Sequence, residues 1–287
     1  MQKLSTITLG CSKNKVDTEH ILSQVEDLYE IIPEGEDIPV HTILLNTCGF
    51  IGDAKEESIQ AVLEAVERKR NGEAEKVIVF GCLSQRYMSE LPALIPEVDA
   101  WFGARDFDPV IRELGAEPSA EKAADRYLTT PSHYAYLKIS EGCDRRCSYC
   151  AIPFIRGAHK SVPIEKLVEE AENLAAKGVK ELILVAQETT MYGIDLYGRK
   201  SLPTLLHELC KIEELKFIRI IYCYPEEITD ELIQVIKKEE KICKYLDLPI
   251  QHASDRILKR MGRRTSQEEL VEIVTKLRKE IPDIILR

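Results

Sequence analysis

Strand-like and helix-like patterns alternate along two stretches of this chain, and the alternation constrains its fold more than any other feature. In the first stretch, the expected strands are 3–9, 41–46, 76–80 and 98–102, and the expected helices are 16–30, 53–70 and 84–95. Such alternation is typical of a parallel sheet covered by helices on both faces. The nearly continuous apolar strands agree with this, because parallel strands are buried on both sides.

The second stretch alternates in the same way. Its expected strands are 134–139, 181–185, 217–222 and 244–248, and its expected helices are 164–177, 202–212, 228–238 and 267–279. Successive strand–helix units of this kind predict a (β/α) barrel or part-barrel. Residues 283–286 resemble the start of a fifth strand, so we expect the barrel to be incomplete and the chain to be truncated.

The two stretches divide the chain into domains. With 287 residues, the chain is long enough for two domains that each bury a core. We predict an N-terminal parallel α/β sheet domain at 1–114 and a partial barrel at 133–287. Between them, 115–132 is rich in Ala, Glu, Pro and Ser and lacks a clear period, which is typical of a linker.

One group of cysteines lies just after the first strand of the second stretch. Cys143, Cys147 and Cys150 have the spacing C-x3-C-x2-C. Three thiolates this close can bind three irons of a cubane cluster and leave the fourth iron open to another ligand. The alternative is a structural zinc site with a distant fourth ligand such as His159. Zinc prefers a closed set of four protein ligands, so the spacing favours the cluster.

A second set of cysteines is spread through the first stretch. Cys11, Cys48 and Cys82 each follow an expected strand, and each has a glycine beside it. Loops that follow parallel strands open on the same edge of the sheet, so the three thiols can meet in one crevice. A single free cysteine is commonly a small buried hydrophobe. Three in matched positions instead predict a second cluster.

The remaining cysteines, Cys210, Cys223 and Cys243, fall in or beside expected helices and strands, and we predict that they are core residues. Disulfides are not expected, because the nine cysteines are an odd number and the chain starts with a strand pattern instead of a signal peptide. No apolar run reaches the roughly 18 residues of a membrane helix. These features indicate a cytoplasmic protein.

The motif from Glu141 to Cys150 resembles that of the radical S-adenosylmethionine (SAM) superfamily. The resemblance implies a six-stranded part-barrel and a 4Fe-4S cluster whose open iron binds SAM. An electron from the cluster then cleaves SAM to methionine and a 5′-deoxyadenosyl radical. It also implies a place for Tyr149 near the adenine, although this side chain could simply pack.

Other residues on the same edge of the barrel are weaker candidates. Gln187 ends the second barrel strand and could contact SAM, and a plain loop role is as good an interpretation. Gln251 and His252 follow the fourth strand with the same two readings. Arg156 could pair with a carboxylate, but we favour a solvated surface charge.

Both halves together resemble the methylthiotransferase family. The segments Gly-Cys-Ser-Lys-Asn-Lys-Val-Asp-Thr-Glu (10–19) and Asn-Thr-Cys-Gly-Phe-Ile (46–51) are similar to its N-terminal domain. Lys13-Asn14 and the segments 186–193 and 245–254 are similar to the RimO branch, which modifies an aspartate β-carbon of ribosomal protein S12. The family's small C-terminal β-barrel domain has no counterpart here.

The resemblance implies a mechanism and a set of partners. The radical removes hydrogen from the substrate carbon, the second 4Fe-4S cluster carries the inserted sulfur, and a second SAM supplies the methyl group. A reduced donor such as flavodoxin would supply electrons. The net charge of −10 suits a basic ribosomal protein and disfavours a broad grip on nucleic acid. The alternatives are a tRNA adenosine methylthiotransferase and a non-catalytic iron–sulfur protein.

Overall fold

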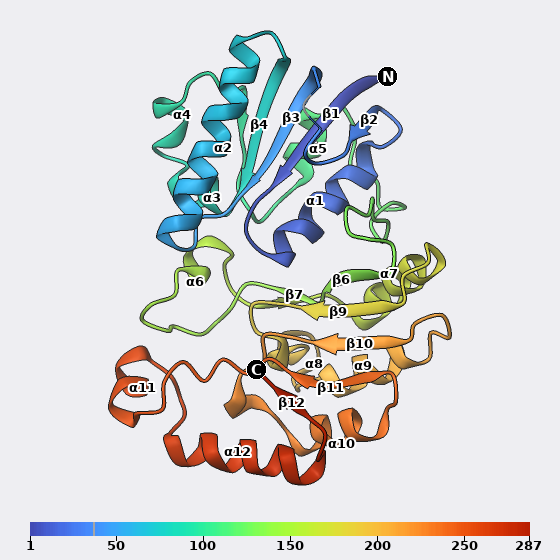
Figure 1. Cartoon of the computed structure of the whole chain (residues 1–287), viewed down its shortest axis with the longest axis vertical. Helices are drawn as coiled ribbons and strands as arrows, with labels where there is room; N and C mark the ends of the chain where they lie inside the picture. Colours follow the sequence, from blue (N-terminus) through green and yellow to red (C-terminus); the bar gives the residue numbers. More distant parts are fainter. Residues whose placement is uncertain (37) are drawn as a thin grey trace. The chain divides into compact units, whose positions relative to one another are not determined.

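The computed structural model describes residues 1–36 and 38–287, which form two compact units (Figure 1). The first unit contains Met1–Thr129 and also Phe154–Arg156, and the second contains Thr130–Pro153 and Gly157–Arg287. Each unit is built on its own five-stranded parallel sheet. The predicted α/β fold class, with a parallel sheet in each half, is confirmed.

The sheet of the first unit has the strand order β2-β1-β3-β4-β5. Its strands are β1 (Gln2–Thr8), β2 (Tyr29–Ile32), β3 (Val40–Thr47), β4 (Ala74–Gly81) and β5 (Ala100–Trp101). Its helices are α1 (Ser12–Val25), α2 (Gly52–Arg70), α3 (Cys82–Tyr87), α4 (Leu91–Leu94) and α5 (Asp108–Glu113).

Both faces of this sheet are buried, as the apolar strands predict. Along β3, Ile43 and Leu45 pack into a core that includes Val62 of α2. Leu44 between them points to the opposite face and packs with Ile21 of α1. Alternate residues of one strand therefore serve two separate cores, and the carboxyl edge of the sheet is left to carry the loops with Cys11, Cys48 and Cys82.

The sheet of the second unit has the order β12-β11-β10-β9-β6, so that each strand pairs with the one before it in sequence. Its strands are β6 (Tyr134–Lys138), β9 (Glu181–Val185), β10 (Phe217–Ile220), β11 (Ile242–Leu246) and β12 (Ile285–Leu286). A small antiparallel pair, β7 (Ser140–Glu141) and β8 (Lys160–Ser161), brackets the cysteine loop. This order, with a helix between successive strands, is that of a part-barrel.

The helices of the second unit follow the predicted pattern. The long ones are α7 (Ile164–Ala176), α9 (Leu202–Cys210), α10 (Asp230–Lys238) and α12 (Gln267–Glu280). The short helices are α8 (Ile194–Tyr197) and α11 (Asp255–Met261), with 3-10 turns η1 (Thr189–Met191) and η2 (Pro225–Glu227). The short helix α6 (Ile152–Ile155) begins in the second unit and ends in the segment assigned to the first. α12 begins at a capping box in which Ser266 and Glu269 satisfy each other's backbone N–H groups.

Two elements of the first unit differ from the sequence-based expectation. The helix expected at 84–95 is two short helices, α3 and α4, separated by a turn. The helix expected at 16–30 ends at Val25, and Tyr29–Ile32 forms the edge strand β2. The apolar residues of that segment fit either a helix face or a buried strand, and pairing with β1 decides the outcome.

Residues 115–132, which we predict to be a linker, contain no helix or strand. Part of the segment nevertheless packs into the first unit, where Arg126 is fully buried and paired with Glu19 of α1. The boundary between the units falls after Thr129.

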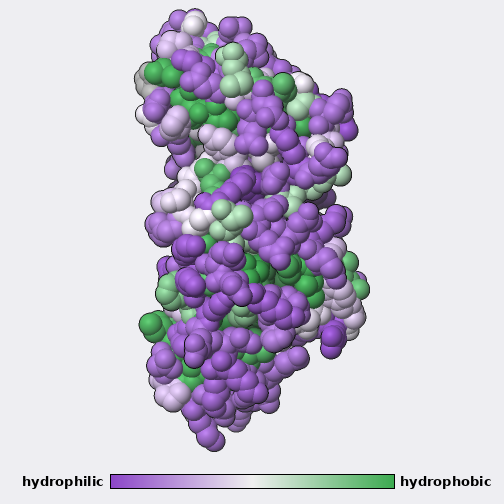
Figure 2. Space-filling view, turned by 90° about the vertical axis from the view of Figure 1, so that its right-hand side faces the viewer, coloured by the Kyte–Doolittle hydropathy of each residue, from purple (hydrophilic) through white to green (hydrophobic). Residues whose placement is uncertain are grey.

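No helix within residues 1–36 and 38–287 has both the length and the hydrophobicity needed to cross a membrane. The face drawn in Figure 2 is mostly hydrophilic, with hydrophobic residues in small separate patches.

Candidate functional site

Cys143, Cys147 and Cys150 lie on the loop that follows β7 in the second unit. The backbone holds this loop at three places. Cys143 N–H donates to the Gly157 carbonyl at 3.0 Å, Cys150 N–H donates to the Cys147 carbonyl at 3.0 Å, and Ser148 N–H donates to the Met261 carbonyl at 2.9 Å. The loop therefore presents its three thiols in a defined arrangement.

Gly142 is required for this loop to form. Its φ of +75° lies in the left-handed region, and a Cβ there would come within 2.1 Å of the Ala158 carbonyl oxygen. Only glycine lets the two backbone segments approach so closely. The close approach places Cys143 beside β8.

The thiols of this first triad are mostly buried. Burial raises the pKa of Cys143 to about 11, a backbone N–H donated by Arg145 opposes the rise, and the neighbouring charges of Glu188, Cys150 and Cys147 add to it. Burial likewise raises the pKa of Cys150. A bound cation or cluster would favour the thiolate form of these side chains.

An aromatic ring held between two guanidinium groups lies against this triad. Arg145 and Arg263 stack on the Tyr224 ring, at 4.2 and 4.1 Å from its centroid. The Tyr224 hydroxyl lies 3.8 Å from Cys147 Sγ. The stacking fixes the ring and so fixes its hydroxyl beside the sulfur.

Three carboxylates balance these cations. Arg145 donates to both oxygens of Glu188, at 2.6 and 3.1 Å, and also pairs with Glu226 and Glu227. Burial raises the pKa of Glu188, and Arg145 opposes the rise. The pKa of Glu227 is lowered, because Lys200 and Arg145 outweigh the opposing effect of burial.

A cavity of about 160 Å³ opens beside the same triad. Its walls include Cys143, Arg145, His159, Glu188 and Arg264. The cavity thus combines the Cys143 thiol, a predicted cluster ligand, with both signs of charge, which suits a zwitterionic ligand.

The other predicted site residues of the second unit differ in their burial and in their hydrogen-bond partners. Gln187 donates to the Glu141 carboxylate, and its own Oε1 is buried without a hydrogen-bond partner. Tyr149 is 45% exposed. His159 contacts Ser161 at 3.1 Å and lies 3.7 Å from Asp195. Gln251 and His252 are exposed after β11, and Gln251 has a φ of +67°.

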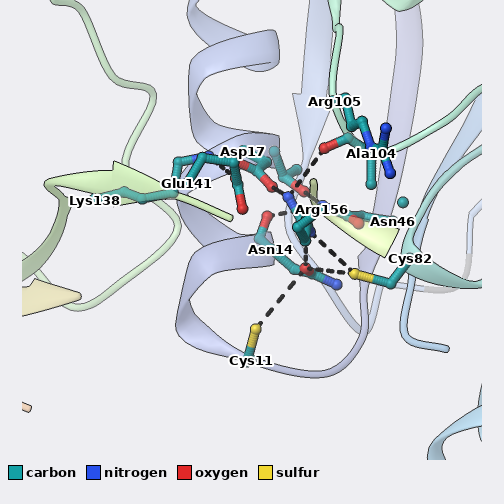
Figure 3. A network of polar contacts seen from close by, with 12 residues as sticks. Cys11, Asn14, Asp17, Asn46, Cys82, Ala104, Arg105, Lys138, Glu141 and Arg156 are labelled. Atoms are coloured by element: carbon teal, nitrogen blue, oxygen red, sulfur yellow. Dashed lines mark hydrogen bonds and ion pairs between the residues drawn. The ribbon is translucent and has the colours of Figure 1, made fainter. Parts of the chain in front are cut away.

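The second triad gathers at the carboxyl edge of the first unit's sheet. Cys11 precedes α1, Cys48 follows β3, and Cys82 is the first residue of α3. Cys11 Sγ and Cys82 Sγ each lie 3.9 Å from the Asn14 Oδ1 atom (Figure 3). A Cβ on Gly10 would come within 2.9 Å of Cys48 Sγ. Sequence positions far apart therefore meet in one place, as the strand–loop pattern predicts.

Burial acts on these thiols as well. It raises the pKa of Cys82 to about 11, while the nearby Arg156 guanidinium opposes the rise and the Cys11 and Cys48 thiols add to it. Burial also raises the pKa of Cys48, and the charge of Cys11 adds to it. The mutual effects of the thiols agree with their grouping.

Arg156 corrects one sequence-based expectation. The preferred reading, a solvated surface charge, is wrong, because the side chain is only 2% exposed and pairs with the buried Asp17 carboxylate at 2.8 Å. Its segment, Phe154–Arg156, packs within the first unit although both flanking segments belong to the second. Arg105 holds this segment by donating to the Ile155 and Phe154 carbonyls at 2.9 and 2.6 Å.

Asn14 ties the second triad together, although in the sequence it stands out only as part of a family resemblance and not as a site residue. Its Nδ2 donates to the carbonyls of Leu9 and Thr47 at 2.8 and 3.3 Å, so it links the ends of β1 and β3. Asn46 Nδ2 in turn donates to the Asn14 carbonyl at 2.8 Å. The available signal was the spacing of Asn14 and Asp17, which puts both on one face of the helix after Cys11.

A single metal ion needs ligands that converge on one position, whereas a cluster does not. Among residues 1–36 and 38–287, no three His, Cys, Asp or Glu side chains converge on one ion position. In a cubane each thiolate binds its own iron, so cluster ligands stand farther apart than the ligands of one ion.

The other cysteines lie outside both triads. Cys223 is fully buried, and Cys210 and Cys243 are half-buried.

Both halves of the chain match described protein families. Residues 137–287 match the radical SAM superfamily. Residues 3–103 match the uncharacterized protein family UPF0004. The two matched ranges contain the first and the second triad respectively.

Curated relatives match over nearly the whole chain. The ribosomal protein uS12 methylthiotransferase RimO of Lachnoclostridium phytofermentans is 54% identical over 99% of this chain and 68% of its own length. The RimO protein of Clostridium botulinum strain Hall is 47% identical over 99% of this chain and 66% of its own length. The chain thus spans about two thirds of the length of these relatives.

Solved structures share the fold at low sequence identity. The radical enzyme OxsB, which is cobalamin- and SAM-dependent, has a TM-score of 0.67 at 14% identity, covering 100% of this chain and 49% of its own. The radical SAM methyltransferase TsrM from Kitasatospora setae has a TM-score of 0.67 at 13% identity, covering 100% and 66%. With the fold, both triads and these relatives in agreement, the chain belongs to the radical SAM superfamily and, within it, to the RimO family of ribosomal protein uS12 methylthiotransferases.

Proposed function

We propose that this chain is the cluster-binding part of a methylthiotransferase that modifies the β-carbon of an aspartate in ribosomal protein uS12. The observation that carries the proposal is the presence of two cysteine triads, each at the carboxyl edge of its own parallel sheet. Each triad would hold a [4Fe-4S] cluster with one iron free of protein ligands. A pure electron carrier has no use for two such open positions.

The first triad would hold the cluster that reacts with SAM. When bound, this cluster supplies an open iron and the electron that cleaves the sulfonium. The chain fixes the thiolates through the backbone hydrogen bonds of the loop and through Gly142. Tyr224, stacked between Arg145 and Arg263, holds its hydroxyl near Cys147.

The cavity beside Cys143 is the proposed SAM site. SAM carries an ammonium, a carboxylate and a sulfonium, so it needs neighbours of both signs. Glu188 would accept from the ammonium, and Arg264 would donate to the carboxylate, since both line the cavity. Gln187 has a buried acceptor, Oε1, that is unsatisfied, and it would accept a hydrogen bond from the ligand. The exposed Tyr149 would cover the adenine.

The second triad would hold the cluster that carries the inserted sulfur. Buried, closely spaced thiols and the absence of a side chain at Gly10 make room for a bulky group beside Cys48. The fit rests on a donor set of three thiols: Cys11 and Cys82 lie at Asn14, and Cys48 lies beside Gly10. The zinc alternative for the first triad needs four protein ligands at one ion position, and among residues 1–36 and 38–287 no such group converges.

The proposed partners follow from charge and chemistry. The net charge of −10 favours approach of a basic ribosomal protein. A reduced donor such as flavodoxin would supply electrons, and the substrate would place the enzyme in the cytoplasm.

Mass spectrometry of two candidate substrates tests the proposal. Cells that lack the full-length enzyme are compared with cells in which it is restored, and uS12 and bulk tRNA are digested from both. We expect a methylthio group on a uS12 aspartate only after restoration, and no change in tRNA. A variant with Cys11, Cys48 and Cys82 replaced by Ala should not restore it. A methylthio group on tRNA adenosine alone would overturn the substrate assignment.

A further inference from the structure

A buried arginine donates a hydrogen bond to a sulfur of the second triad. Arg156 Nε lies 3.2 Å from Cys82 Sγ (Figure 3). Nη1 donates to Asp17 at 2.8 Å and to the Ala104 carbonyl at 3.2 Å. Nη2 donates to Asn14 Oδ1 at 2.6 Å. The guanidinium is thus held on three sides with one edge toward the sulfur.

Stability alone does not account for this arrangement. Burying an ion pair costs desolvation energy that the attraction between the charges barely offsets, and an apolar pair of the same size is often as stable. Arg156 and Asp17 are both almost fully buried. Arg156 of this pair also contacts Cys82 Sγ, which indicates that its function is to act on that sulfur.

The planar fork of arginine suits such a role. It keeps its charge under all physiological conditions and donates in several fixed directions. Asn14 takes part in the same fork, and its Oδ1 lies 3.9 Å from both Cys11 Sγ and Cys82 Sγ. Through Asn14, the arginine therefore orders two of the three thiols.

The positive charge of Arg156 also affects the electron affinity of a cluster held by the second triad. Hydrogen bonds to cluster sulfurs and nearby positive charge stabilise the reduced form and raise the reduction potential. Asp17 opposes this effect, because its carboxylate lies against the same guanidinium. The two residues therefore act on the potential in opposite directions.

We propose that Arg156 is a positioning residue of the second triad, which fixes the Cys82 thiolate and raises the reduction potential of the cluster held there. The inference rests on the proposed second cluster and not on the identity of the substrate. It gives the segment after Cys150 a role toward the other triad, since Arg156 follows Cys150 by only six positions in the sequence.

The test is a redox titration of the reconstituted full-length protein, followed by electron paramagnetic resonance. Cys143, Cys147 and Cys150 are replaced by Ala, so that only the second triad can hold a cluster. In this background Arg156→Gln should lower the midpoint potential. At a fixed potential we expect about a tenfold higher ratio of oxidised to reduced cluster, which is 59 mV for one electron. Asp17→Asn should shift the potential in the opposite direction.

Arg70→Gln is the matched control. It also removes one arginine from the first unit, but Arg70 is 66% exposed on α2 and pairs with Glu97, and it is not among the residues that contact the thiols or Phe154–Arg156 in the described chain. Its potential should equal that of the parent. Iron content and circular dichroism are measured for every variant.

The outcomes separate the two proposals. If the parent binds no iron, the second cluster is wrong. If the parent binds iron and Arg156→Gln has the potential of Arg70→Gln, the inference about Arg156 is overturned. If Arg156→Gln fails to fold, the sign of the shift in Asp17→Asn decides, and an unchanged or lowered potential overturns the inference. A folded Arg156→Gln that lacks iron, while Arg70→Gln keeps all of its iron, supports the positioning role.

Discussion

Glu19 and Arg126 form a second buried ion pair in the first unit. Glu19 also accepts hydrogen bonds from the backbone N–H and the hydroxyl of Thr129, at 2.9 and 2.8 Å. Both charged side chains are at most 1% exposed. The pair and Thr129 attach the segment after α5 to α1, so this residue-scale contact determines where the first unit ends.

Replacing Glu19 with Ala should lower the free energy of unfolding by about 3–5 kcal/mol, because it leaves the Arg126 charge buried without its carboxylate. Urea unfolding followed by circular dichroism measures the effect. Asp27→Ala is the control, since Asp27 pairs with Lys122 of the same segment but is 78% exposed. The control should change stability by less than about 1 kcal/mol. Equal effects in the two variants would contradict the prediction.

At the scale of elements, Asp195 joins the short helix α8 to β8. Its carboxylate accepts from Ser161 N–H at 2.9 Å and from the Ser161 hydroxyl at 2.6 Å. Burial acts to raise the pKa of Asp195, but the hydrogen bonds from Ser161 and the nearby His159 outweigh it and lower the pKa. The folded state therefore binds this proton less readily than the unfolded state.

A lowered carboxyl pKa stabilises the fold above the unfolded pKa of about 4, and this contribution is lost as the pH falls through the folded value. Asp195→Asn should therefore be less stable than the parent at pH 7, and the difference should shrink below about pH 4. Urea titrations across this range measure it. Asp283→Asn, at an exposed position, is the control for the substitution itself. A difference for Asp195→Asn that is constant with pH would refute the assignment.

The elements also show how much of the fold can be predicted from the sequence. Strand β9 has the predicted bounds, and helices α7 and α12 differ from prediction by one residue, because their apolar periods are long and regular. Short elements such as β7, β8 and α8 have too few residues to show a period. The thiols of the first triad could be grouped from their spacing in the sequence, and those of the second from their matched positions after expected strands. The position of Arg156 could not, since it depends on one turn of chain that packs with the other unit.

The contacts among the charged residues near the first triad could not be predicted from the sequence either. Gln187 could be placed at the end of a strand by its sequence position. The stacking of Arg145 and Arg263 on Tyr224 brings together residues from three separate loops, and no local pattern encodes it. Glu188, next to Gln187, was visible as a carboxylate at a strand end, but its pairing with Arg145 required the fold.

For the whole molecule, the two triads should hold iron independently, because each belongs to its own compact unit. Replacing Cys143, Cys147 and Cys150 with Ala should remove about half of the iron of the reconstituted protein, and so should replacing Cys11, Cys48 and Cys82. Iron analysis with Mössbauer spectroscopy checks this. The control, Cys210→Ser with Cys243→Ser, should keep all of the iron, because these half-buried thiols lie outside both triads. Complete loss of iron from either triad variant would contradict independence.

The placement of Phe154–Arg156 has a consequence for how the chain matures during synthesis. When residue 129 has left the ribosome, the first unit has all its strands, but Arg156, which pairs with Asp17, has not yet emerged. That cation arrives only after β6, β7 and the whole cysteine loop have been made. The N-terminal unit therefore completes its interior only when translation has already passed the first cysteine triad. A nascent chain halted before residue 156 would contain Cys11, Cys48 and Cys82 but would lack Arg156, which holds the Cys82 thiol.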